Sequence, residues 1–335
     1  MIRRPRRRAA LVAGTVGLAL VVLSACASPL PQPDPAPVPA VAPPATTIGQ
    51  SDDVLTDLGA VLAAGDAALD PALLAPRVSG PALAIRSAEY VRAKATANVK
   101  PPTVIPTKAQ ALILPQTDTW PRTQLVVTEQ PDDLQAPRIL VLQQSAPRDQ
   151  YHLWGWGRMG QGIKMPPTAA PATGSPVLAP DTASLKVAPA DVFAQYSDVL
   201  ANGTASQYNA SFAPDAFRTG IEAARATTAA GVGSAGTATE TYTPEPTPLT
   251  SLATLDGGAI VVGQLTTVST VQLTAGGTVR IDDPFYAALT GKSSASSSFI
   301  RTFTDVVIMY VPPAGSSALM QVLAAEHAIT TVTAD

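Results

Sequence analysis

The stretch Asp53–Gly65 reads DVLTDLGAVLAAG, and the stretch Asp191–Gly203 reads DVFAQYSDVLANG. They lie 138 positions apart and align without a gap. Two further matches keep the same offset, namely Leu74-Ala75-Pro76 with Phe212-Ala213-Pro214 and Leu83 with Ile221. This period is far longer than the roughly 20–50 residues of a solenoid repeat. We therefore predict a tandem duplication in which each copy is a domain, with chance matching in an alanine-rich chain as the alternative.

Each copy is expected to open with two helices. In both stretches the apolar residues recur three and four positions apart, which is one face of an α-helix. Gly65 and Gly203 follow the last apolar residue and are expected to end these helices in the left-handed conformation. A second helix is expected from Pro81 to about Ala97 and from Asp215 to about Ala229, with Asp215 as its N-cap.

Strands are expected after the helices, because the pattern changes to a period of two with many β-branched residues. In the first copy they are expected at Ala111–Leu114, Gln124–Glu129, Ile139–Gln144 and Gln150–Arg158. In the second copy they are expected at Ser251–Leu255, Ala259–Thr267, Thr270–Thr274, Thr278–Asp282, Arg301–Val311 and Ala318–Ala325. Asp256-Gly257 has the composition of a hairpin turn, and Asp283–Ser298 is a predicted insertion.

Helices followed by antiparallel strands predict the α+β class. We expect two tandem related domains, each with N-terminal helices packed on a curved antiparallel sheet. This order of elements resembles the cone-shaped nuclear-transport-factor-2-like or SnoaL-like fold, and the cystatin-like fold is a near alternative. The resemblance covers the element order only. It implies a cavity, which catalytic members of the cone fold equip with an acidic or histidine base.

The N-terminus carries the pattern of an export signal. Five arginines between Arg3 and Arg8 precede an apolar run from Ala9 to Val22, which is too short to span a membrane. Leu23-Ser24-Ala25-Cys26 resembles the lipobox of bacterial lipoproteins, and Cys26 is the only cysteine in the chain. The resemblance implies cleavage before Cys26, lipidation of its thiol and attachment to the outer face of the cell membrane. The export route, general secretory or twin-arginine, stays open.

These features divide the chain into five parts. Residues 1–25 are the expected signal peptide, and 26–47 form a lipidated, proline-rich tether that favours an extended conformation. Residues 48–160 and 189–335 are the two expected domains. Residues 161–188 form a linker whose apolar residues, such as Leu178 and Leu185, can dock. The composition, rich in alanine, threonine and proline and poor in lysine, resembles that of actinobacterial lipoproteins.

Charge and composition exclude several classes of function. The formal net charge is −3, and removal of the arginine-rich signal makes it about −8, which disfavours nucleic acid as a partner. With no unmodified cysteine and only His152 and His327, we expect no metal site and no cofactor. His327 is expected on the surface near the frayed C-terminus. Gly155–Gly160 and Gly231–Gly236 match GxGxxG but do not join a strand to a helix, so neither predicts a dinucleotide site.

One aromatic segment is a candidate ligand or interface site. Trp154 and Trp156 alternate with glycines, so that on a strand both indoles would face one side, beside His152 and Arg158. Such a pair can stack on a sugar ring or contact a partner's apolar patch. The competing interpretation is that both indoles fill the core, as large aromatic side chains usually do.

We predict a membrane-anchored extracytoplasmic lipoprotein that acts as a non-enzymatic binding or scaffold module of the cell envelope. Its candidate partners are the membrane, through the lipid, and an envelope protein or glycan. The first alternative is a small-molecule-binding or enzymatic cone-fold protein, which a buried carboxylate in a pocket would favour. The second is a transporter's solute-binding protein, whose alternating strands and helices this segregated order does not match.

Overall fold

A computed structural model describes residues 42–131, 135–246 and 249–335. The expected signal, the lipobox with Cys26 and most of the tether lie outside these residues. Within the described ranges, no helix combines the length and the apolar composition needed to cross a membrane.

The described chain combines helices with antiparallel sheet, so the predicted α+β class is confirmed. The helices are α1 (Ile48–Ala68), α2 (Gly80–Ala95), α3 (Pro189–Asn202), α4 (Ala216–Val232) and α5 (Pro284–Thr290), with short 3-10 turns at Pro71–Leu74, Gly203–Ala205, Asn209–Ser211 and Gly233–Ala235. The strands of the first half are β1 (Ala109–Ile113), β2 (Pro115–Gln116), β3 (Arg122–Thr128), β4 (Arg138–Gln144), β5 (His152–Met159) and β6 (Ser175–Pro176). Those of the second half are β7 (Gly236–Pro244), β8 (Thr250–Ala253), β9 (Ala259–Leu273), β10 (Val279–Arg280), β11 (Ser294–Ala295), β12 (Ser298–Val311) and β13 (Gln321–Ala334).

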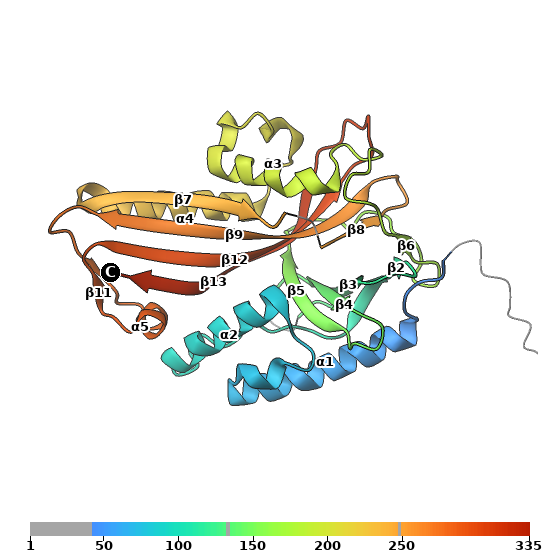
Figure 1. Ribbon diagram of the computed structural model, residues 1–335, viewed down its shortest axis with the longest axis horizontal. Helices are drawn as coiled ribbons and strands as arrows, with labels where there is room; N and C mark the ends of the chain where they lie inside the picture. Colours follow the sequence, from blue (N-terminus) through green and yellow to red (C-terminus); the bar gives the residue numbers. More distant parts are fainter. Residues whose placement is uncertain (1–41, 132–134, 247–248) are drawn as a thin grey trace, which may run out of the picture. The chain divides into compact units, whose positions relative to one another are not determined.

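Strands of both halves form one nine-stranded sheet in the order β1-β3-β4-β5-β13-β12-β9-β7, with β8 also paired to β9 (Figure 1). Strand β5 of the first half and strand β13 of the second half therefore lie side by side near the middle of the sheet, and the sheet joins the two halves. β5 and β13 are joined by two residue pairs only, Met159 with Ala324 and Arg158 with Ala325. All described residues fall within one compact unit, Val41–Asp335.

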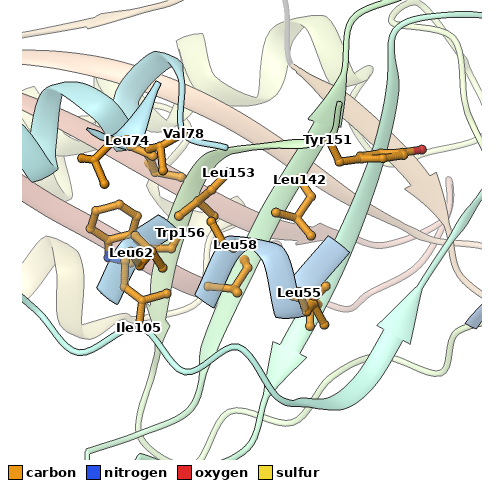
Figure 2. Close-up of a cluster of buried hydrophobic side chains, with 14 of the residues drawn as sticks. Leu55, Leu58, Leu62, Leu74, Val78, Ile105, Leu142, Tyr151, Leu153 and Trp156 are labelled. Carbon is orange, nitrogen blue, oxygen red and sulfur yellow. The ribbon is translucent and has the colours of Figure 1, made fainter. Parts of the chain in front are cut away.

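The buried side chains form layers on both sides of these strands. The first core lies between α1, α2 and one face of the first half, where Leu58, Leu153 and Trp156 are almost wholly buried (Figure 2). The opposite face of the first half packs against the second half, through side chains such as Val141 and Ile308. Helix α2 also contacts β12 and β13, and Val306 of β12 belongs to the first core.

Two glycines allow β5 to cross the second half closely. A Cβ on Gly157 would lie 2.9 Å from backbone atoms of Ala324 and Ala325, and one on Gly155 would lie 3.1 Å from Val306. Any larger side chain at Gly157 would push β13 away from β5. The sequence of alternating glycines therefore serves close packing of strands from the two halves.

The two helix ends that the duplication predicts behave differently. Gly203 ends α3 at the predicted position with a positive φ of 56°, but its ψ of −127° is not the predicted left-handed helical conformation. Gly65 does not end α1, which continues to Ala68 and is capped by Leu69 in the left-handed region. A Cβ on Gly65 would lie 2.6 Å from Leu74 Cδ2 and 2.7 Å from the Tyr90 hydroxyl oxygen. Glycine is needed there for close packing, so the predicted cap at Gly65 is wrong.

The segments expected as tether and linker pack against the folded body where they are described. Ala45 N–H donates to the Pro115 carbonyl at 2.8 Å, and Thr46 is buried. In the predicted linker, Leu185 is buried beneath α3, and Leu178 packs against the same cluster. Residue Val177 forms a bridge with Leu252 while remaining exposed.

Candidate functional site

A cavity of about 1520 Å³ opens where β5 and β13 diverge. Its walls come from the ends of β3 and β4 in the first half, the loop that follows β5, the start of α4 and the middle of β13. Both halves therefore contribute to it. Beyond Ala325, β13 has no pairing with β5, so one edge of β13 borders this space.

One wall carries three charged side chains, Arg138, Arg158 and Glu326, which we name the cavity cluster. Arg138 and Arg158 are direct partners in the β4–β5 register, so their side chains leave neighbouring strands on the same face. Arg138 is 2% exposed, and its Nη2 donates to Gln135 Oε1 at 3.3 Å. Arg158 is exposed, and it forms no ion pair with a described residue.

Glu326 lies in this cluster without a close salt bridge to another described side chain. Burial raises the pKa of Glu326 to about 7, and the charge of Glu89 on α2 acts in the same direction. The positive charges of Arg138 and Arg158 lower it, but by less. The indole of Trp156 also favours the charged carboxylate, although its Nε1 makes no hydrogen bond of standard geometry. Glu326 is therefore a carboxyl group that titrates near neutrality.

The wall on the other side of β13 holds an aspartate–histidine pair. His327 Nδ1 lies 2.6 Å from Asp305 Oδ1, and the second oxygen of Asp305 accepts a hydrogen bond from Thr267 Oγ1 at 2.5 Å. Asp305 is fully buried, whereas the His327 side chain is 26% exposed and lines the cavity. The imidazole stacks on Phe303 with ring centroids 4.1 Å apart and meets the edge of Phe217. These contacts fix the ring and leave Nε2 without a described partner.

A second acidic group lies at the start of α4. Asp215 caps this helix by accepting the Arg218 N–H at 2.7 Å, as predicted, and its two oxygens lie 3.0 Å from the Tyr196 hydroxyl. Burial raises the pKa of Asp215, while these hydrogen bonds act in the opposite direction. Asp215 also lines the cavity.

A separate charged cluster, which we name the Arg86 network, lies between α1 and α2. Arg86 is 1% exposed and donates to Asp66 at 2.6 Å and to Glu89 at 2.8 Å. Glu89 also accepts the N–H and the hydroxyl of Thr103, and Tyr90 donates to Asp66 at 2.7 Å. Both carboxylates are therefore compensated by close partners.

The structure places the four residues of the predicted aromatic site in different surroundings. Trp156 is 0% exposed in the first core, where Figure 2 shows its indole near Leu62 and Ile105. The β4–β5 register shifts at Trp154, so the expected alternation of the two indoles is interrupted, and Trp154 packs against two cores. His152 Nδ1 lies 3.0 Å from the Gln150 carbonyl. Of the four, only Arg158 lines the cavity.

Sequence reasoning missed the other residues of the cavity. The expected frayed terminus near His327 is wrong, because β13 continues to Ala334; the His327 side chain is partly exposed and pairs with Asp305. Glu326 and Arg138 lie in strands, where a polar residue is usually solvent-exposed, so the sequence did not indicate that they line a cavity. No group of three or more His, Cys, Asp or Glu side chains within the described ranges is placed to hold a metal ion.

The comparisons with known proteins identify a family without a described activity. A family model described as "Domain of unknown function (DUF8094)" matches residues 42–334. The chain belongs to this family. No curated protein and no solved structure matches the chain.

Proposed function

We propose that this chain is a lipoprotein held to the extracytoplasmic face of the cell membrane through Cys26. The lipobox at residues 23–26 and the arginine-rich apolar segment before it support this proposal. A Cys26→Ala variant is expected to lose palmitate label in cells and to leave the membrane fraction. A variant that still partitions with membranes would contradict the anchor.

We further propose that the folded body is a non-enzymatic binding module that takes a small polar molecule into its cavity. The observation that carries this is a cavity of about 1520 Å³ whose walls bear charged side chains from both halves. Binding pockets commonly combine an apolar lining with a few converging polar groups. Here Met159 and Phe217 accompany the cavity cluster and Asp215.

The test obstructs the cavity while leaving the helix that borders it intact. Gly220 on α4 lines the cavity, and a Cβ there would meet nothing within 4 Å. Gly231 on the same helix also has open space but does not line the cavity. Native mass spectrometry of the full chain is expected to show a co-purified small molecule, which Gly220→Phe loses and Gly231→Phe retains. Equal occupancy in both variants would contradict the proposal.

The tandem origin of the two halves is also a proposal. In each half two helices precede the strands. From the centre of the sheet to its edge, the strands run in the reverse of chain order, as β5-β4-β3-β1 in the first half and β13-β12-β9-β7 in the second. The matching sequences at Asp53–Gly65 and Asp191–Gly203 lie in the first helix of each half. An experimental structure in which the halves cannot be superposed would contradict a common origin.

An enzymatic function is the second candidate, and the Asp305–His327 pair is the observation that favours it. A histidine oriented by a buried carboxylate, with its other nitrogen open to a cavity, can accept a proton from water or a ligand. This agrees with the base that the cone-fold resemblance implies for catalytic members. Turnover of chromogenic esters or phosphate esters by the full chain, lost in His327→Gln, would support this candidate. Absence of turnover with such a panel would favour the binding module.

A further inference from the structure

We propose that the cavity binds the oxyanion of a small molecule, a carboxylate or a phosphate, on the guanidinium group of Arg158, and that Glu326 takes up a proton in the same step. This inference rests on the proposed binding function and names the ligand class. Guanidinium groups bind carboxylate and phosphate oxygens through paired, charge-assisted hydrogen bonds.

The pairing of the two arginines makes this wall receptive to an anion. Arg138 and Arg158 face one another directly across β4 and β5, an arrangement in which like charges repel. Arg138 is buried and already holds contacts within the protein, so Arg158 is the group of this pair that is open to the cavity. Arg158 is exposed in the cavity and has no ion-pair partner among the described residues, so its guanidinium is available to a ligand.

Glu326 is the acidic group that a bound anion would meet. A carboxylate in a close ion pair with arginine has a lowered pKa, whereas the pKa of Glu326 is raised to about 7, mainly by burial. The charged form is therefore poorly compensated by the two arginines. When protonated, Glu326 no longer repels an anion, and its O–H can donate a hydrogen bond to it.

Other charged groups surround Glu326 and determine how a bound anion changes its pKa. Glu89 faces it from α2, and its negative charge is shared with Arg86 and Arg92 in close ion pairs. Arg138 and Arg158 face it from β4 and β5. Lys164 in the loop after β5, Asp215 on α4 and His327 on β13 line the same cavity, with His327 held by Asp305. A bound anion adds negative charge to this set and therefore raises the pKa of Glu326 further.

The pH dependence of binding follows from this linkage. Because the pKa of Glu326 is higher in the complex than in the free protein, affinity is full below the free-protein pKa of about 7. Affinity then falls about tenfold per pH unit until the pH exceeds the pKa in the complex. Replacing Glu326 with glutamine, a neutral side chain of the same shape, keeps the high-affinity state at all pH values.

The experiment is isothermal titration calorimetry on the full chain in detergent, with three probes. At about pH 6, where Glu326 is mostly protonated, succinate and glycerol 3-phosphate are titrated separately. Binding of succinate alone assigns a carboxylate ligand, binding of glycerol 3-phosphate alone assigns a phosphate, and binding of neither overturns the proposal. Sulfate, whose charge stays constant from about pH 6 to about pH 9, reports the pH dependence.

Three variants make the test specific. Arg158→Gln is expected to weaken binding of the probe at least about tenfold, as loss of a charge-assisted pair does, whereas Arg280→Gln, at an exposed position outside the cavity, is expected to bind as the parent does. Glu326→Gln is expected to bind sulfate equally at both ends of the pH range. Parent-like binding by Arg158→Gln, or an unchanged pH dependence in Glu326→Gln, would overturn the inference. If the anionic probes do not bind but Gly220→Phe still loses a co-purified molecule that the parent retains, the proposed binding function stands and only the ligand class is wrong.

Discussion

The Arg86 network and the cavity cluster contain the same kinds of side chain but differ in how their charges are compensated. Arg86 holds two carboxylates at 2.6 and 2.8 Å, beneath the helices of the first half. In the cavity cluster, by contrast, Arg158 forms no ion pair with a described residue, and the pKa of Glu326 is raised to about 7. The first arrangement stabilises the packing of α1 on α2. The second leaves charge available to a molecule from outside.

The largest expected effect on stability is at the Arg86 network. Arg86→Ala leaves Glu89 and Asp66 without their shared cation in a buried site, and the loss of one partner of a buried ion pair costs about 3–5 kcal/mol of unfolding free energy. Urea denaturation of the full chain measures this. Arg158→Ala is the matched control, and we expect it to change stability by less than about 1 kcal/mol because Arg158 is exposed. Equal losses in both variants would remove the distinction between the two clusters.

The next effect concerns the titration of Glu326. Because its folded-state pKa is raised, the neutral carboxyl favours the fold; this contribution is full below the unfolded-state pKa and is lost as the pH rises to about 7. Glutamine does not titrate, so above about pH 7 the free energy of unfolding of Glu326→Gln should exceed that of the parent by on the order of 3 kcal/mol. At acidic pH the unfolding free energies of the two proteins should converge. Denaturation curves that differ by the same amount at every pH would contradict a titrating Glu326.

A smaller loss of stability is expected from overpacking beside the Arg86 network. Gly65 lies in α1 against Tyr90 of this network, where an added Cβ would lie 2.7 Å from the Tyr90 hydroxyl oxygen. Gly65→Ala should therefore destabilise the protein by about 1–3 kcal/mol, the usual cost of overpacking. Thermal unfolding measures the change, and a neutral outcome would show that this site is loosely packed.

The smallest effect is expected at the cavity, with the opposite sign. Gly220 lies in α4 beside open space. Gly220→Ala should raise stability by about 0.5–1 kcal/mol, because alanine has the higher helix propensity and meets no neighbour. A loss of stability in the same thermal assay would indicate that side chains fill this part of the cavity.

Local patterns in the sequence predict much of the fold. The helical apolar spacing locates α1 and α3, and Asp215 caps α4 as expected. The edge strand β7 was missed, because its Thr- and Glu-rich residues show no buried position. Two predicted strands join as the single β9, since the intervening Val268 and Ser269 remain paired with β12. The joining of both halves into one sheet depends on contacts between residues far apart in sequence.

The site was harder to predict for the same reason. Arg158 was singled out, but as a neighbour of the tryptophans and not as part of a charged wall. Glu326 and His327 gain their properties from residues on other strands and helices, such as Asp305 and Glu89, which no spacing along the chain reveals. Isolated polar residues in a strand pattern are most often solvent-exposed, and this expectation concealed them.

Carbon-13 NMR can follow the titration of the Glu326 carboxyl in the full chain, with and without sulfate. We expect a midpoint at about pH 7 that moves upward when sulfate is added. A midpoint near the ordinary glutamate value of about 4.3, unchanged by sulfate, would show that Glu326 is fully compensated and that the cavity cluster is as closed as the Arg86 network.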